Sequence, residues 1–383
     1  MIILSFYKYF SFLLIFGLFI HSSYSQDSNK VDVNTTQGLE KIIYLLDQSK
    51  KQFPQNDSIA LAYGNEALKI AEKTANQDLI LTCYNQLLLL YYQLNDIDAA
   101  KDISRQAEQT VFKAQNTENK AIFFQLSGQS YKRVAEFNLA EYYFKKSIES
   151  YQQVQKTDSL YTIYLNLAKI HQNKHEYDTG ANYAFKSLAL AKKNKNLDKV
   201  AESRKAVGEI NAEQKNYGIA LENFLENLSY YERKIDTIGI SQALNDIALT
   251  YYMKGENELS IDYSEKSLAL RKLMGNKSLL AENYNNLSLP YNNQKNWKIC
   301  LVYLNKALEL VIELNDLENI PFVLTNIGNL KFRQGFYKES IRYYEEAFNY
   351  QKKNNKLVAH LKYNGKLSEV FSKKGEHQKA LNH

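Results

Sequence analysis

The stretch GFYKESIRYYEEAFNY, residues 335–350, has the pattern of a turn followed by an amphipathic helix, with small residues set among tyrosines. A similar segment, KNWKICLVYLNKALEL, occurs forty residues earlier at residues 295–310. Another, GENELSIDYSEKSLAL, occurs forty residues before that at residues 255–270. One helix is therefore repeated at a fixed spacing, which indicates a repeat protein.

Three sets of small residues extend the forty-residue spacing over most of the chain. The first set, placed in the middle of the second helix of each unit, is Ala60, Ala100, Ala140, Gly180, Ala220, Ser260, Cys300, Ser340 and Ala380. The second set lies in the first helix, with Leu88 as its one large exception, and is Gly128, Ala168, Gly208, Ala248, Ser288, Gly328 and Ser368. The third set is broken only by Asn227 and is Ala67, Ala107, Ser147, Ser187, Ser267, Ala307 and Ala347. Small side chains let two helix backbones approach to about 8–10 Å, so each unit is predicted to be a packed helix hairpin with a longer second helix.

Composition agrees with a helical protein. Glycine (14) and proline (3) are sparse for 383 residues, whereas a strand-rich or loop-rich chain needs many more turn residues. The net charge of +6 comes from scattered Lys and Arg, without the concentrated basic patch of a nucleic-acid-binding protein. The sequence therefore predicts that this segment binds no nucleic acid.

The N-terminus predicts export. Lys8 precedes a mostly apolar run from Tyr9 to Ile20, and Ser23-Tyr24-Ser25 fits a signal-peptidase site. We therefore predict a cleaved secretory signal over residues 1–25, a short linker over 26–37 and a periplasmic or secreted protein. The alternative is an uncleaved anchor that holds the chain to the membrane, facing the periplasm. Cys83 and Cys300 fall in helices several repeats apart and are predicted to be buried apolar side chains rather than a disulfide.

Aromatic residues recur in the same register. They stand three residues after the small residue of the first helix, at Tyr91, Tyr131, Tyr251 and Tyr291. This spacing is typical of core packing rather than of a ligand cage.

The small and aromatic positions together resemble the tetratricopeptide repeat. The resemblance covers residues 38–383 and implies an all-α solenoid of about eight to nine forty-residue units, the last of them incomplete. The usual period is 34 residues; forty-residue variants are found in exported bacterial relatives, and we attribute the six extra residues here to the second helix and the turn after it.

Motifs of catalysis are missing from the sequence. It has no phosphate-binding glycine loop, no nucleophile elbow and no zinc-protease motif. His171 and His175 are spaced i, i+4, but two ligands are too few for a closed metal site, so both are predicted to be ordinary repeat residues. Pro290 interrupts a first helix and is predicted to bend it. We expect no enzymatic activity, no cofactor and no metal.

The family resemblance implies that the first helices line a concave surface for a protein or an extended peptide. The candidate binding residues at the implied positions are Gln125, Gln129, Lys132, Arg133, Asn166, Lys169, Asn173, Lys205, Asn245, Asn285, Asn292, Asn326, Asn329 and Arg333. The same positions also carry Asn85, Gln172, Glu209, Asp246, Tyr252, Asn286 and Asn293. Amides dominate, and they suit pairing with a peptide backbone. Lys132, Arg133, Lys169 and Lys205 would favour an acidic segment or a C-terminal carboxylate.

Some members of the family bind chaperone C-termini through a carboxylate clamp. Here Lys205 is followed by Glu209 and Asp246, which would repel a carboxylate, so that function is not expected. The sequence favours an exported, non-catalytic scaffold that binds a protein partner outside the cytoplasm. The alternative is the periplasmic sensor region of a membrane-spanning regulator with a histidine-kinase or DNA-binding output, because the chain stops two turns into a helix of a unit.

Overall fold

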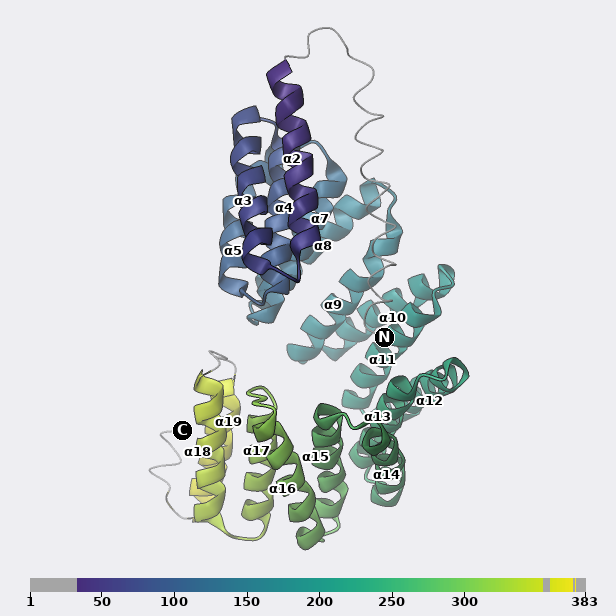
Figure 1. Cartoon of the computed structure of the whole chain (residues 1–383). Coiled ribbons are helices and arrows are strands. Elements are labelled where there is room, and N and C mark those ends of the chain that lie inside the picture. The colour runs from purple at the N-terminus through teal and green to yellow at the C-terminus, as the bar shows by residue number, and fades with distance from the viewer. Residues whose placement is uncertain (1–32, 354–358, 375, 377–383) are drawn as a thin grey trace. The chain divides into compact units, whose positions relative to one another are not determined.

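The computed structural model describes residues 33–353, 359–374 and 376, and every regular element among them is a helix. The chain divides into two compact units at residues 127 and 128, within a helix that contributes to both. Figure 1 shows the helices of each unit as a succession of antiparallel pairs. The predicted all-α arrangement of stacked helix hairpins is therefore confirmed.

The first unit contains one complete hairpin and one whose second helix is interrupted. Its helices are α2 (Val33–Gln52), α3 (Asp57–Thr74), α4 (Gln77–Gln93), α5 (Ile97–Gln106) and α6 (Glu108–Lys113). α2 begins five residues before the array was expected to start. The helix that spans the boundary is α7 (Thr117–Arg133).

The second unit continues the hairpins without an interruption of this kind. Its helices are α8 (Phe137–Gln153), α9 (Leu160–Asn173), α10 (Tyr177–Lys193), α11 (Leu197–Glu213), α12 (Tyr217–Lys234), α13 (Thr237–Lys254), α14 (Asn257–Met274), α15 (Lys277–Asn293), α16 (Trp297–Glu313), α17 (Ile320–Arg333), α18 (Tyr337–Lys353) and α19 (Ala359–Lys374), with a 3-10 turn at Thr157–Ser159. The predicted signal segment and the end of the chain, including Ala380, lie outside the described residues. Within the described ranges, no helix combines the length and the apolar character that crossing a bilayer requires.

The small residues are buried at the positions that the forty-residue spacing gives them. In the first set, every described member from Ala60 to Ser340 is buried. These residues are the fourth of their helices, as Ala140 is in α8 and Ala220 in α12, so the expected position in the middle of the second helix was wrong. The second helix is also not consistently the longer one, because α13 and α14 both have 18 residues. The extra residues of the forty-residue period are therefore shared between the two helices.

Two further pairings recur within several of the hairpins at a fixed spacing. Aromatic rings of the first helix stack on the residue twelve positions later. The pairs and their centroid separations are Tyr131–Tyr143 at 5.3 Å, His171–Tyr183 at 5.4 Å, Tyr251–Tyr263 at 5.5 Å and Tyr291–Tyr303 at 5.8 Å. Glycines of the second small-residue set face an aromatic ring sixteen positions later, in the pairs Gly128–Phe144, Gly208–Phe224 and Gly328–Tyr344. The aromatic residues thus form core, as predicted.

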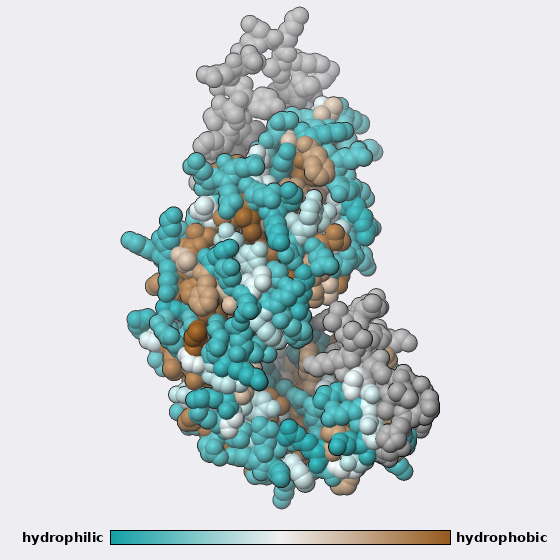
Figure 2. All heavy atoms as spheres, turned by 180° about the vertical axis from the view of Figure 1, so that it is seen from behind, coloured by the Kyte–Doolittle hydropathy of each residue, from teal (hydrophilic) through white to brown (hydrophobic). Residues whose placement is uncertain are grey.

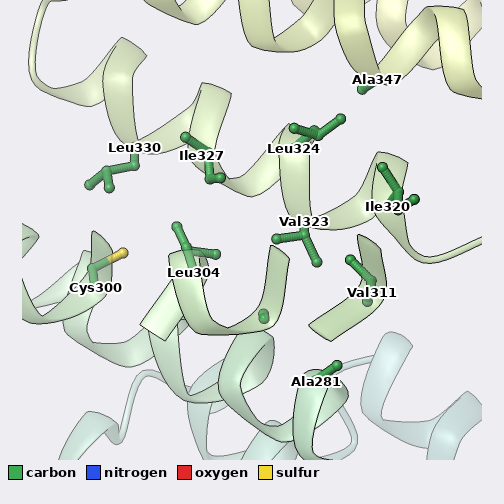
Figure 3. Close-up of a cluster of buried hydrophobic side chains, with 11 residues drawn as sticks. Ala281, Cys300, Leu304, Val311, Ile320, Val323, Leu324, Ile327, Leu330 and Ala347 are labelled. Atoms are coloured by element: carbon green, nitrogen blue, oxygen red, sulfur yellow. The ribbon is translucent and has the colours of Figure 1, made fainter. Parts of the chain in front are cut away.

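Packing between successive hairpins also contributes to the core. In one cluster, Cys300 and Leu304 of α16 and Ile327 and Leu330 of α17 are all at most 1% exposed. Figure 3 shows the side chains of these two helices pointing toward one another. Cys83 and Cys300 are free, buried thiols, as expected. Burial raises the pKa of each thiol to about 12.

Several helices begin with the same kind of N-cap hydrogen bond. Side chains of Asn76, Asn196, Asp236 and Asn276 each accept a hydrogen bond from the backbone N–H three residues later, at 3.0–3.2 Å. Pro321 lies in the first turn of α17, as expected. α15 continues as a helix through the buried Pro290 to Asn293.

Candidate partner-binding surface

The first helices of the second unit contact one another in succession, from α9 through α11, α13 and α15 to α17. Together with the last turns of α7, they carry a face that we call the first-helix surface. Its candidate residues are mostly half-buried, as Asn166, Asn285 and Asn326 are, while Lys169 and Arg333 are exposed. Figure 2 shows mainly hydrophilic residues on one side of the molecule, with hydrophobic residues in small separate patches.

A chain of amide hydrogen bonds links three of these helices. Asn286 Nδ2 on α15 donates to Asn245 Oδ1 on α13 at 3.1 Å. Asn326 Nδ2 on α17 donates to Asn285 Oδ1 on α15 at 2.8 Å, and Asn285 is 3.5 Å from Asn286 Oδ1. Each amide has two N–H donors and two oxygen lone pairs, so one internal bond of each kind leaves further bonding capacity on the half-buried members.

Charged groups gather beside this chain, on α11, α13, α14 and α15. Lys205 Nζ lies 3.6 Å from Asp246 Oδ2 and 3.9 Å from Glu209 Oε1. Burial acts to lower the pKa of Lys205, but Asp246, Glu209 and Glu282 outweigh it and raise that pKa. The pKa of Asp246 is raised to about 7, mainly by burial. Glu209 and Glu282 raise it further, and Lys205 only partly offsets these effects. Two carboxylates therefore lie within 4 Å of one ammonium group, and the charge of Glu282 also acts on it.

A group that the sequence prediction missed supports this cluster. Arg271 of α14 is fully buried, and its Nη1 donates to the Leu279 carbonyl at 2.7 Å and to Glu282 Oε2 at 3.3 Å. Glu282 also accepts from Asn245 Nδ2 at 3.1 Å. The signal in the sequence was a charged residue where the forty-residue register puts Ala191 and Val311 in other units.

The α7–α9 end of the surface has the opposite charge. Lys132 Nζ donates to the neutral Asn166 Oδ1, and Asn166 Nδ2 donates to the Thr162 carbonyl at 3.0 Å. Lys169 Nζ donates to Gln172 Oε1 at 3.0 Å. Burial lowers the pKa of Lys132, and the nearby Lys169 and Arg133 lower it further. Three cations therefore lie at this end, and Lys169 Nζ is also 3.8 Å from Glu209 Oε2 on α11.

The other end of the surface, on α15 and α17, is held by hydrogen bonds within the protein. Arg333 Nη1 lies 3.4 Å from the Asn292 carbonyl and 3.2 Å from Asn293 Oδ1, and donates to both. Asn329 Oδ1 accepts from the Tyr344 hydroxyl at 2.7 Å. These candidates are therefore brought together, with part of their bonding capacity in use.

Three further candidates and Asn85 take no part in the hydrogen bonds described above. Asn85 is buried and donates to the Asn119 carbonyl at 3.0 Å, so it supports the packing of the first unit. Gln125 belongs to the first-unit part of α7, whereas Gln129 is half-buried and Asn173 exposed in the second unit.

The two histidines take the repeat roles predicted for them. His171 is buried against Tyr183, and its Nδ1 lies 2.6 Å from Glu176 Oε2. His175 occupies the turn after α9 with a φ of +60°, the site that glycine takes at Gly255 and Gly335. Among the residues that the structure describes, no three His, Cys, Asp or Glu side chains converge in a way that could hold a metal ion.

Comparison with known proteins gives the fold an identity. No protein-family model and no curated protein sequence matches the chain. Solved structures do match. A tetratricopeptide repeat protein from Parabacteroides merdae is 15% identical with a TM-score of 0.53, over 71% of this chain and 93% of its own. The fold is that of a tetratricopeptide-repeat protein.

Two further structures of this type match over more of the chain. Aspartyl phosphate phosphatase F from Bacillus subtilis is 15% identical with a TM-score of 0.61, over 88% of both chains. A Rap protein complexed with competence and sporulation factor is 15% identical with a TM-score of 0.59, over 89% of this chain and 95% of its own. At these identities the tetratricopeptide-like arrangement is what the proteins share.

Proposed function

We propose that the protein is a non-catalytic interaction module that binds a protein or extended peptide segment along the first-helix surface. The observation that carries this proposal is the chain of amides from Asn245 to Asn326, placed on successive first helices that touch one another. An extended backbone presents alternating N–H and C=O groups, and the amides offer both partners. Their internal bonds hold the side chains in place, which reduces the entropy lost when a segment binds.

The similar structures support a binding role without deciding it. One is a Rap protein complexed with competence and sporulation factor, whereas another is named as a phosphatase. Because one fold hosts many functions, the assignment depends on the site. The first-helix surface carries amides and paired charges, which suit hydrogen bonding to a bound segment.

A selection experiment tests the binding surface. Random displayed peptides would be selected on the immobilised full chain, and the affinity of the selected peptides would be measured by fluorescence polarisation. Asn285→Ala combined with Asn326→Ala should weaken binding by about thirtyfold, because each of the two lost hydrogen bonds contributes on the order of 1 kcal/mol. The matched control is Asn182→Ala with Asn305→Ala, two exposed asparagines of second helices. Equal loss in both variants, or a failure to select any peptide, would contradict the proposal.

We also propose that binding takes place outside the cytoplasm. The support is the apolar run and the small-residue site in residues 1–25. Fractionation of the native cells, followed by intact-mass measurement, tests this. A species shortened by the predicted signal segment and found outside the cytoplasm is expected, and a cytoplasmic species that retains Met1 and the apolar run would refute it.

A further inference from the structure

The buried arginine of α14 is not explained by packing. Arg271 is 0% exposed, and its Nε and Nη2 groups have no hydrogen-bond partner among the residues that the structure describes. Removing a charged group from water is unfavourable, and donors without partners add to the cost. The equivalent positions of two other units hold the buried aliphatic residues Ala191 and Val311, so packing at this site does not need a charge. A different role for the guanidinium group is therefore indicated.

The third nitrogen of that group holds a carboxylate in place. Arg271 Nη1 donates to Glu282 Oε2 at 3.3 Å, and to the carbonyl of Leu279, one turn earlier in α15, at 2.7 Å. The side chain of Glu282 is 48% exposed, whereas that of Arg271 is buried, so an exposed carboxylate is fixed from the buried side. A carboxylate accepts hydrogen bonds and donates none, so any partner of its other oxygen must be a donor.

That donor is the first member of the chain of amides. Asn245 Nδ2 donates to Glu282 Oε1 at 3.1 Å, which leaves Asn245 Oδ1 to accept from Asn286 Nδ2, also at 3.1 Å. The same order continues, because Asn285 Nδ2 lies 3.5 Å from Asn286 Oδ1 and Asn326 Nδ2 donates to Asn285 Oδ1 at 2.8 Å. If every NH2 group and oxygen of the chain changed places, an amide oxygen would face the carboxylate. Glu282 therefore excludes one of the two arrangements.

We propose that Arg271 is a positioning residue for the first-helix surface, because through Glu282 it fixes which end of each amide faces its neighbour. This inference rests on the proposed function and deepens it. The half-buried amides of the chain then each keep one N–H group and one oxygen lone pair in a defined place for the bound segment. Ordered side chains lose less entropy on binding, so loss of Arg271 weakens binding although this buried residue does not touch the segment.

Arg271→Met tests the proposal on the full chain, with peptides selected on the wild-type protein and affinities measured by fluorescence polarisation. We expect binding to weaken by about fivefold, the effect of releasing one ordered side chain. The midpoint of chemical denaturation should not fall, because replacing a buried charged group by an apolar one is often neutral or stabilising. The carboxylate of Glu282 that is left behind is exposed. A residue that acted only in packing would change the midpoint and leave the affinity of the folded protein unchanged.

A double-mutant cycle shows whether the effect passes through the amides. Asn286→Ala breaks the chain between Asn245 and the later helices, so adding Arg271→Met to it should change the affinity by less than about twofold. Suppose instead that Glu282 itself contacts the segment. Arg271→Met would then weaken binding equally with and without Asn286→Ala, and the proposal would be wrong.

Arg204→Met is the matched control. Arg204 of α11 also pairs with a glutamate, Glu226 of α12, but this pair has no hydrogen bond to the amide chain. The control should leave the affinity unchanged. An unchanged affinity in Arg271→Met, or an equal loss in the control, would overturn the positioning role.

Two further variants keep the outcomes distinct. If Arg271→Met also lowers the denaturation midpoint, Glu282→Ala decides, since it removes an exposed side chain. A similar loss of affinity in Glu282→Ala supports the positioning role, and an unchanged affinity refutes it. Asn285→Ala with Asn326→Ala reports on the proposed function separately. If that variant still loses binding while Arg271→Met does not, only the positioning role fails. If it binds as the wild type does, both fail.

Discussion

At the scale of single residues, the fit between glycine and aromatic rings controls how closely the two helices of a hairpin approach. A Cβ built on Gly208 would lie 2.6 Å from the ring of Phe224, which is itself only 2% exposed. Leu88 was the one large residue of this set, and the residue sixteen positions after it is the small, buried Ser104. A large residue on one helix is therefore matched by a small residue on the other. The spacing of the small residues alone did not predict this exchange.

We predict that Gly208→Ala destabilises the protein by about 1–3 kcal/mol, because the buried ring cannot move away from the added methyl group. Gly218→Ala is the matched control. Gly218 lies in the next helix, α12, with nothing within 4 Å of the added atom, so alanine there should stabilise the protein by about 0.5–1 kcal/mol. Chemical denaturation measures both changes. Destabilisation of similar size in the two variants would show that the ring contact does not matter.

The charge state of Asp246 gives a prediction for pH. Its pKa in the folded protein is raised to about 7 by burial and by Glu209 and Glu282, against the attraction of Lys205. The buried guanidinium group of Arg271 also acts in this cluster. Because the folded pKa lies above the unfolded pKa of about 4, the folded state binds the proton more tightly. The stabilisation from this proton is complete below pH 4 and is lost as the pH rises to 7 and above.

Asp246→Asn removes this titration while keeping the shape of the protonated side chain. The melting temperature of the variant minus that of the wild type should be small near pH 4, should rise between pH 4 and 7, and should be positive and level at pH 8. Thermal unfolding followed by circular dichroism across this range measures the difference. A difference that stays constant with pH would show that Asp246 ionises at its ordinary pKa.

At the scale of elements, α2 differs from every later first helix in the face it presents. In six later units, the position equivalent to Asp47 holds a fully buried aliphatic residue. These residues are Leu87, Leu167, Val207, Ile247, Leu287 and Ile327. Glu40 likewise stands where other units bury Ile80 or Leu160. Both acidic residues are exposed, beside the exposed Ile43 and Tyr44. α2 therefore has the polar outer face of a capping helix.

We predict that Glu40→Leu with Asp47→Leu makes the protein self-associate, because the two new leucines would join Ile43 and Tyr44 in a continuous apolar strip. Sedimentation velocity would show a larger species than the wild type at the same concentration. The control is Lys69→Leu with Glu72→Leu, which changes two exposed residues of α3. An unchanged sedimentation coefficient in the α2 variant, or an equal increase in the control, would contradict the capping role.

The sequence predicted the hairpins well because the small buried residues recur at a fixed spacing of forty residues. It did not predict where the helices end in detail, because backbone conformation at the turns is not limited to glycine. Lys215 and Ile235 both adopt positive φ values, at +64° and +56°. The second helix of the second hairpin also divides into α5 and α6. After that break, Asp78 Oδ1 accepts the N–H groups of Gln115 and Asn116 at 2.8 Å each.

The candidate surface was less predictable than the fold. Spacing placed Asn245, Asn285 and Asn326 on successive first helices, and the structure brings them together. Spacing could not show that such side chains bond one another across forty residues, because that depends on the angle between helices. Arg271 was missed because it lies on a second helix, outside the positions that the family resemblance implies.

At the scale of the whole molecule, stability is spread along the array by packing, without a covalent link. Both cysteines of the chain are free and buried, and burial raises the pKa of each thiol to about 12. Neither thiol is therefore available as a reactive thiolate at neutral pH.

We predict that a reducing agent leaves the melting temperature unchanged, in contrast to small exported proteins that depend on disulfides. Thermal unfolding with and without the reductant measures this, and thiol labelling of the native and unfolded protein provides the control. A lower melting temperature under reducing conditions, or fewer than two labelled thiols after unfolding, would show that a disulfide forms.

The forty-residue register affects how the number of repeat units in such a protein can change. The N-cap residues Asn196, Asp236 and Asn276 occupy equivalent sites, and the turns at Lys215 and Gly255 share the same left-handed backbone conformation. Successive junctions therefore have the same backbone register. Gain or loss of one whole unit by recombination would keep this register, so the units that newly meet would present helices in the same alignment. The length of segment that the protein can hold is thus adjustable in fixed steps, while the packing rules of the fold stay the same.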